Sequence, residues 1–483
     1  MKKNSITTNA FFNLLYKGLS VVFPLITVSY ASRVLGPSGM GDIASSQNFV
    51  TYFVLIASLG IAPYGVRILA QKRNNINLCN RAFTELFIIN GISTLVSMLI
   101  YFIVIIWFGS FSRLESLNLI FSILIVFNIF NIDWVYQAME EYRYIAYRSF
   151  VIKIISLFML LVFVKSKDDI YVYAWIVCFG TVGNYFLNML YSKKYVFFNF
   201  HKLSFRQHFI PIIVFFASIV AIELYSLIDV TMLTYFTDSA SVGYYTNASK
   251  IVKTFTGTIT AIGAVLLPRL SIYYAKEEMS NYKSTVEKML KLILILTVPA
   301  TIGICFVAHD IVIIMFGEEF FPSSQTIQTL SFLIIFMTLS GGIGAQILQT
   351  TNNERSYLTA VCEGAIINIF LNSILIGPFR QNGAAIASVI TEAVVAVMML
   401  VKCKPIVQIQ LGKRFAFDIA SAVLFMSFGL MICQMIDSNM STIFRLSIEI
   451  LTGMSIYFGI LLLRKNNETM NICKKIIQKI TNF

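Results

Sequence analysis

The sequence predicts an all-α, polytopic membrane protein with about fourteen transmembrane helices. The chain is 57% hydrophobic and only 13% charged, whereas a soluble protein carries about 25% charged residues. Its apolar residues fall into runs of about 20, the length that crosses the hydrocarbon core as a helix. Because backbone groups find no water there, helices are the expected structure, and the alternating segments of a membrane barrel are absent.

Fourteen apolar runs carry this prediction. The first follows Lys2 and Lys3, but it is longer than the apolar core of a signal peptide and lacks a cleavage site. We therefore expect it to stay as a membrane anchor. The runs cover residues 10–31, 42–62, 83–108, 117–137, 145–164, 171–192, 209–235, 244–267, 289–308, 324–349, 357–376, 382–401, 415–436 and 442–463.

The distribution of basic residues predicts the orientation. With both termini in the cytoplasm, 26 of the 37 Lys and Arg residues lie on the inner side and six on the outer side, as the positive-inside rule requires. The basic residues behind the net charge of +13 are then explained as topology signals that face anionic lipid, and not as a nucleic-acid-binding surface. We expect a multi-pass protein of the bacterial cell membrane.

Signatures of catalysis, metals and cofactors are missing from the sequence. The seven cysteines are scattered and show no ligand spacing. The Gly-rich segment 36–41 lacks the Lys-Ser/Thr of a phosphate-binding loop and is interpreted as a tight turn. We expect no enzyme, no metal and no cofactor.

An internal repeat predicts the domain organisation. An offset of 202 residues places the first span on the seventh, Gly41 on Gly243 and Arg67 on Arg269. Six spans per half give two lobes of the same orientation, which would enclose a central cleft. The predicted domains are an N-terminal six-helix lobe (1–200), a second six-helix lobe (201–408), and a C-terminal helix pair with its tail (409–483).

Polar residues recur on single helical faces of several spans. On the eighth span, Lys250, Lys253, Gly257 and Thr260 follow spacings of 3, 4 and 3. Such faces are either packing seams with snorkelling lysines or the wall of a hydrated cleft, which would suit an anionic, phosphate-bearing cargo. The candidate substrate-binding cations are Lys17, Arg33, Lys153, Lys250 and Lys253.

Acidic residues within the spans form a second set of candidates. Glu223, Asp229 and Glu392, together with Glu363, either neutralise the lysines or bind a coupling proton or sodium ion. Glu223 and Asp229 are the first choices for ion coupling.

Asp133 is a carboxylate close to the end of the fourth span. We expect Trp134 and Tyr136 beside it to anchor at the membrane interface. Asp133 can pair with Arg143, Arg148 or Arg67, either as a gate between lobes or as a structural ion pair.

Six segments in register resemble the bacterial lipid-linked oligosaccharide flippases, Wzx-type polysaccharide biosynthesis proteins of the MATE-like exporter superfamily. They are RVLGPSGMGD (33–42), SLGIAPYGVRILAQKR (58–73), NIDWVYQAMEEYRYIAYRS (131–149), VGYYTNASKI (242–251), LLPRLS (266–271) and NGAAIASVITE (382–392).

The resemblance implies a MATE-like fold and a substrate, an oligosaccharide repeat unit on undecaprenyl diphosphate that moves from the cytoplasmic to the outer leaflet. The pathway would be surface polysaccharide synthesis (lipopolysaccharide or capsule), with polymerase and chain-length proteins as possible partners. Because the sequence has no nucleotide-binding motif, an ion gradient, the membrane potential or removal of product would drive the cycle, and ion-gradient-coupled alternating access is the prediction. A MATE-type multidrug exporter, a peptidoglycan-precursor exporter and a membrane polysaccharide polymerase stay open as alternatives.

Overall fold

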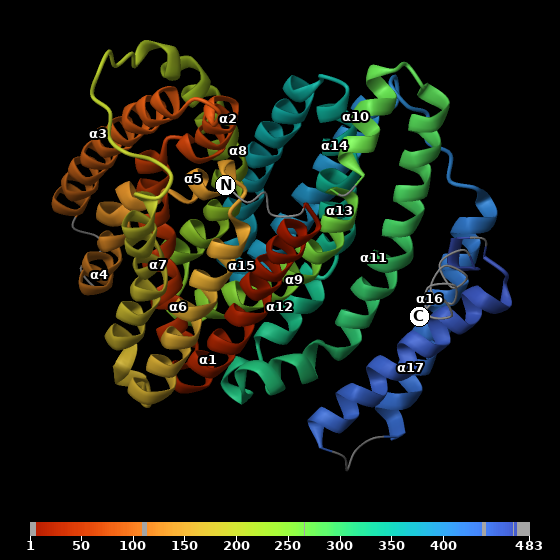
Figure 1. The fold of residues 1–483 in the computed structure, drawn as a ribbon. Helices are drawn as coiled ribbons and strands as arrows, with labels where there is room; N and C mark the ends of the chain where they lie inside the picture. Colours follow the sequence, from red (N-terminus) through yellow and green to blue (C-terminus); the bar gives the residue numbers. More distant parts are fainter. Residues whose placement is uncertain (1–5, 109–113, 265, 437–440, 467, 471–483) are drawn as a thin grey trace. The chain divides into compact units, whose positions relative to one another are not determined.

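The computed structural model describes residues 6–108, 114–264, 266–436, 441–466 and 468–470. Within these ranges every regular element is helical, as predicted (Figure 1). The chain divides into two compact units, Met1–Gly243 and Tyr244–Phe483. The lobe boundaries predicted near residues 200 and 408 stay a prediction.

The helices of the first unit alternate between long spans and short breaks. They are α1 (Ile6–Ser58), α2 (Ile61–Lys72), α3 (Ile76–Phe108), α4 (Glu115–Val126), η2 (Phe127–Phe130), α5 (Asp133–Ala138), α6 (Tyr142–Phe163), η3 (Lys167–Asp169), α7 (Ile170–Ser192) and α8 (Arg206–Phe236).

The second unit takes up most of α9 and all later helices. They are α9 (Ser239–Ala264), α10 (Leu267–Ala275), α11 (Met279–Phe316), η4 (Glu318–Phe320), α12 (Ser323–Leu330), α13 (Leu333–Leu339), the π-helical η5 (Ser340–Gly344), α14 (Ala345–Thr350), α15 (Glu354–Cys403), α16 (Lys413–Ile436) and α17 (Thr442–Leu463).

Ten helical segments in the described ranges are long and apolar enough to cross a membrane, in agreement with a polytopic membrane protein. Two of them, Phe23–Lys72 and Glu354–Cys403, contain 50 residues each. A straight helix of that length would be about 75 Å long, more than twice the roughly 30 Å hydrocarbon core. Each covers two predicted spans, so the count of fourteen stays a prediction.

Both long segments are interrupted at the predicted connections. Gly36 has φ 70° and ψ 177° inside α1, a conformation that glycine adopts at little cost, which agrees with the tight turn predicted for 36–41. In α15, Arg380 has φ 49°. A Cβ on Gly383 would lie 2.0 Å from the carbonyl oxygen of Leu375, whereas eight residues of straight helix span about 12 Å. The chain therefore folds back there.

The predicted fourth span is broken near its middle. Its residues form α4, the 3₁₀ turn η2 and α5. Asn128 in the turn is buried; its side-chain oxygen accepts a hydrogen bond from Ser58 Oγ at 3.1 Å, and its amide donates to Asn90 Oδ1 at 3.3 Å. Neighbouring polar side chains satisfy such a break within a membrane.

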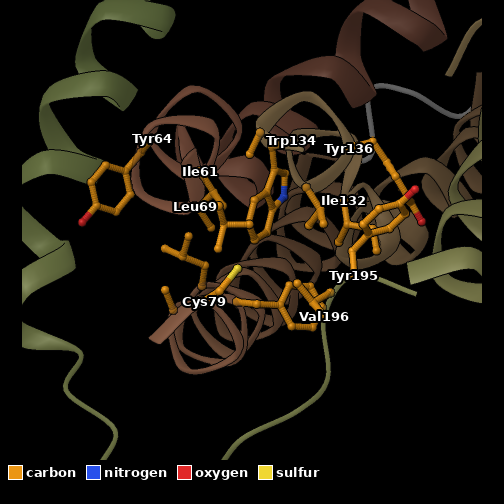
Figure 2. Close-up of a cluster of buried hydrophobic side chains, with 14 of the residues drawn as sticks. Ile61, Tyr64, Leu69, Cys79, Ile132, Trp134, Tyr136, Tyr195 and Val196 are labelled. Carbon is orange, nitrogen blue, oxygen red and sulfur yellow. The ribbon is translucent and has the colours of Figure 1, made fainter. Parts of the chain in front are cut away.

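The core of the first unit forms around Trp134, which is 2% exposed (Figure 2). A Cβ on Gly65 of α2 would lie 2.5 Å from the indole ring, so the glycine lets α2 pack directly on α5. Tyr136 is also fully buried, and its hydroxyl donates to the carbonyl of Asn188. The prediction that Trp134 and Tyr136 are interfacial anchors is therefore wrong, because α5 turns both rings into the protein interior.

The start of α9 packs against α1 in a reciprocal way. A Cβ on Gly41 would lie 1.7 Å from the carbonyl oxygen of Ser239, and a Cβ on Gly243 would lie 2.2 Å from that of Pro37. Each glycine thus lies against the carbonyl group of the residue four positions before the other glycine. The 202-residue offset places Pro37 on Ser239 and Gly41 on Gly243, so it converts each of these contacts into the other. This symmetry supports the predicted repeat.

In the second unit, α16 and α17 pack on α11. Their core includes Ile295 of α11, Met426 of α16 and Tyr457 of α17. Ion pairs join Arg445 with Asp310 and Arg464 with Asp418, the latter at 3.5 Å. The helices α16 and α17 therefore pack within the second compact unit.

Candidate functional site

The clearest cationic surface lies on α9. Lys250 and Lys253 are exposed, whereas Val252, Thr256 and Ile259 on the opposite face of the helix are buried. Neither lysine has an ion-pair partner among the described residues. Lys250 lies about 16 Å along the helix from Ser239, well away from either end of this 26-residue element.

The energetics favour water over lipid on this surface. The described part of α9 is not among the ten segments apolar enough to cross a membrane, so that it forms the predicted eighth span stays a prediction. In a helix that does cross, a lysine at the centre costs about 3 kcal/mol when it faces lipid. Two exposed lysines on one helical face would double that penalty, and Gly257 continues the same exposed face. The arrangement is therefore typical of a helix that borders a hydrated space and can bind an anion.

The predicted cations of the first unit have different surroundings. Lys153 on α6 is half-buried between the buried Ser149 and Ser156, and its Nζ lies 5.8 Å from the ring centroid of Phe23 on α1. Arg33 on α1 is exposed. The side chain of Lys17 lies outside the described residues. That all five cations border one chamber stays a prediction.

The three coupling candidates also differ in their surroundings. Asp229 on α8 is 6% exposed, and Glu223 is half-buried. Glu392 on α15 is 6% exposed and accepts a hydrogen bond from Ser340, the first residue of the π-helical turn η5. Glu363, the fourth acid, forms an ion pair with Lys402 at 3.8 Å, a lysine outside the candidate set. That the acids neutralise the candidate lysines stays a prediction.

Asp133 pairs with Arg148, one of the three partners that the sequence offered. Arg148 Nη1 lies 2.8 Å from Asp133 Oδ1, and the guanidinium is only 3% exposed. Arg148 also donates to Asn184 Oδ1 at 3.0 Å and to Asn188, whose amide donates to Asp133 at 2.6 Å. These contacts join α5, α6 and α7.

The other two predicted partners of Asp133 lie on the surface. Arg143 is exposed, with its guanidinium 5.9 Å from the ring centroid of Phe12, and Arg67 is also exposed. The buried guanidinium of Arg148 has its carboxylate partner within one unit, as a structural ion pair requires. A role of Asp133 as a gate stays a prediction.

An apolar groove of about 290 Å³ lies between α11, α16 and α17. Pro299, Gly303 and Ile304 form one wall, and Met454 and Phe458 lie on another. A single carboxylate, Glu449, lines it and is 2% exposed. Sequence reasoning missed this groove, because its walls combine residues about 150 positions apart.

A second group that sequence reasoning missed is Tyr64, Glu85 and His208. Both Glu85 and His208 are fully buried, and their side chains are 2.8 Å apart. The only sequence signal was the presence of Glu85 and His208 near the ends of two apolar runs. Three or more His, Cys, Asp or Glu side chains suited to a metal ion occur nowhere in the described part of the chain.

Comparison with known proteins identifies the family. Residues 6–274, more than half of the chain, match the model of the family described as "Polysaccharide biosynthesis protein". A "Putative O-antigen transporter" of Shigella dysenteriae is 22% identical over 407 residues, which cover 83% of this chain and 99% of the relative.

Two solved structures share the fold. The lipid II flippase MurJ, at 16% identity, has a TM-score of 0.74 over 93% of this chain and 98% of its own. An inward-facing multidrug resistance MATE family transporter of the MOP superfamily, at 13% identity, has a TM-score of 0.64 over 82% and 97%. All three proteins are named as transporters or flippases, not enzymes. The family resemblance seen in the sequence is confirmed, and this chain belongs to the polysaccharide biosynthesis protein family.

Proposed function

We propose that this protein is a flippase that moves undecaprenyl-diphosphate-linked oligosaccharide repeat units from the cytoplasmic to the outer leaflet. The family match and the similarity to the Shigella protein support a role in surface polysaccharide synthesis. The observation that carries the proposal is the pair of exposed lysines, Lys250 and Lys253, in the middle of α9.

The chemistry of the substrate fits these features. A single hydroxyl costs about 4–8 kcal/mol when it enters hydrocarbon without a partner, so an unassisted oligosaccharide would cross negligibly slowly. The diphosphate would pair with the lysines of α9, while the sugars stay in water. The polyprenyl tail would stay in lipid and could slide along the apolar groove between α11, α16 and α17.

The cycle needs no covalent step. Two six-helix lobes, with fourteen spans in all and both termini in the cytoplasm, would alternate access to the cleft. The acids Glu223, Asp229 and Glu392 are the proposed binding sites for a coupling proton or sodium ion.

The test is a flipping assay in proteoliposomes with undecaprenyl-diphosphate-linked oligosaccharide. We expect Lys250→Ala with Lys253→Ala to lower the rate at least tenfold, because the diphosphate loses its partners. Lys276→Ala is the matched control, since Lys276 is an exposed cation beyond the end of α10. Wild-type flipping rates in the double variant would refute the role of α9. Efflux of drugs from the same proteoliposomes in the absence of the lipid-linked oligosaccharide would favour a multidrug exporter.

A further inference from the structure

A buried polar cluster joins three helices of the first unit, away from the lysines of α9. His208 Nε2 on α8 lies 2.8 Å from Glu85 Oε2 on α3, and His208 Nδ1 lies 2.8 Å from the hydroxyl of Tyr64 on α2. Glu85 and His208 have no exposed surface. Figure 2 shows that the Tyr64 hydroxyl points away from the apolar cluster around Trp134.

The carboxylate of Glu85 is saturated with donors. Besides His208, it accepts hydrogen bonds from the backbone amide of Ser204 at 2.5 Å, from Arg81 Nε at 3.0 Å and from Gln207 Nε2 at 3.2 Å. Four donors hold this side chain as a carboxylate. Glu85 therefore fixes the segment that enters α8, because Ser204, Gln207 and His208 all bond to it.

A neutral imidazole can satisfy all of these contacts. His208 Nε2–H donates to Glu85, so Nδ1 is left to accept from the Tyr64 hydroxyl, and every group is satisfied by a neutral ring. The charges of Arg81 and Glu85 then cancel. A further proton on Nδ1 would turn the Tyr64 hydrogen away from its acceptor and add a net charge beside two side chains that have no exposed surface.

The ionisable groups around His208 come from each helix that packs on it. Tyr64 and Arg67 lie on α2, with Arg67 acting electrostatically on Tyr64, and Arg81 and Glu85 lie on α3. The segment before α8 contributes the backbone amide of Ser204. A proton on His208 thus meets one carboxylate that is already paired with Arg81.

Hydrogen bonds attach the other end of α8 to α1. A displacement of the amino-terminal end would therefore tilt the helix relative to this attachment. Thr234 bonds Ser45 at 2.8 Å, and Thr231 bonds Asn48 at 2.7 Å and Tyr52 at 2.8 Å. Between the two ends, Gly60 approaches the backbone of α8 so closely that a Cβ there would lie 2.6 Å from the amide nitrogen of Phe216. This contact can serve as a pivot.

We propose that Tyr64, Glu85 and His208 form a proton-binding site that controls the attachment of the amino-terminal end of α8 to α2 and α3. A proton from water binds at Nδ1 of His208, and the charged ring is stabilised when that end of α8 separates and water enters. Deprotonation returns the proton to water and restores the attachment. By linkage, movement of α8 also changes the proton affinity. The use of this coupling in transport rests on the proposed function.

The first test measures proton binding directly. The chain has three histidines, so histidine-selective NMR of the full protein in nanodiscs gives three signals, and His208→Asn assigns one of them. We expect the His208 signal to depend on pH in the wild type, and Glu85→Gln to change that dependence, because the carboxylate beside the ring is lost. Tyr64→Phe, which keeps the carboxylate, should change it less. A His208 signal that is independent of pH, or that behaves identically in Glu85→Gln, would overturn the site.

The second test measures coupling with the lipid-linked oligosaccharide assay in proteoliposomes. We expect an imposed pH gradient to change the wild-type flipping rate at least threefold, and Glu85→Gln or His208→Asn to reduce this response at least by half. Any response that remains is assigned to the proposed coupling acids Glu223, Asp229 and Glu392. Asp310→Asn is the control, because it breaks another buried ion pair, that with Arg445, and should keep the response.

The two tests separate the possible failures. A gradient response of wild-type size in both variants would contradict the coupling. Absence of flipping in the wild type would refute the proposed function instead, while the NMR titration would still decide whether the proton site exists.

Discussion

Charges within the helices of the two units differ in their surroundings. In the first, the buried Arg148 meets the half-buried Asp133 and two asparagines, and Glu85 meets four donors. The second also has ion pairs, such as Arg445 with Asp310, but its Lys250 and Lys253 lie exposed on one face of α9. A charge that is buried needs a partner nearby, whereas a charge that faces water does not. The contrast separates residues that hold the fold together from residues that are available to a substrate.

The largest effect should follow from breaking the paired charges. Asp133→Ala leaves Arg148 buried without its carboxylate, and we expect it to lower the free energy of unfolding by about 3 kcal/mol. Thermal unfolding of the purified protein measures this effect. Arg143→Ala is the control, because this exposed arginine lies outside the network, and its effect should stay within about 0.5 kcal/mol. A double variant, Asp133→Leu with Arg148→Met, should recover part of the lost stability, because no unpaired charge is left. If Arg143→Ala lowers the free energy of unfolding as much as Asp133→Ala does, then the ion pair does not stabilise the fold more than a surface charge.

A smaller effect is expected where backbones rather than charges meet. Gly41→Ala would place a methyl group 1.7 Å from the carbonyl oxygen of Ser239, so the contact between α1 and α9 must open. We expect a loss of about 2 kcal/mol. Gly257→Ala on the exposed face of α9 meets no atom within 4 Å and should be nearly neutral. If Gly41→Ala and Gly257→Ala destabilise the protein equally, then Gly41 is not needed for the close packing of α1 on α9.

Several features could be predicted from the sequence because they are local or periodic. Apolar runs of about 20 residues predicted the membrane helices, and the 3, 4, 3 spacing that begins at Lys250 predicted one face of α9, which is exposed. The tight turn at Gly36 follows from residue type. Each of these features depends on neighbours within a few positions, which a single sequence displays directly.

Other features depend on partners that are distant along the chain. Glu85 and His208 are 123 positions apart, so their meeting depends on how α3 and α8 pack. The sequence predicts an interfacial anchor at Trp134 because this residue stands beside Asp133 near the end of a span, and the structure buries it instead. Its burial depends on Gly65, 69 positions earlier, which makes room for the ring. Single-sequence reasoning could offer Arg148 only as one of three partners for Asp133, since spacing does not distinguish among them.

The smallest effect is the most informative about the exposed charges. Lys250→Met removes the charge and keeps the length of the side chain. If the face of α9 borders lipid, then the substitution removes a penalty of up to about 3 kcal/mol and the protein becomes more stable. If the face borders water, then little is gained, because the ammonium group is already hydrated.

We expect the unfolding free energy of Lys250→Met to stay within about 0.5 kcal/mol of the wild type, while binding of the diphosphate headgroup falls. Steric trapping in bicelles measures the first quantity in the presence of a bilayer. A gain above about 1 kcal/mol would mean that Lys250 faces acyl chains, and the cationic surface proposed to bind the substrate would lose its basis. Lys253→Met should behave in the same way, since it lies three residues further along the same exposed face.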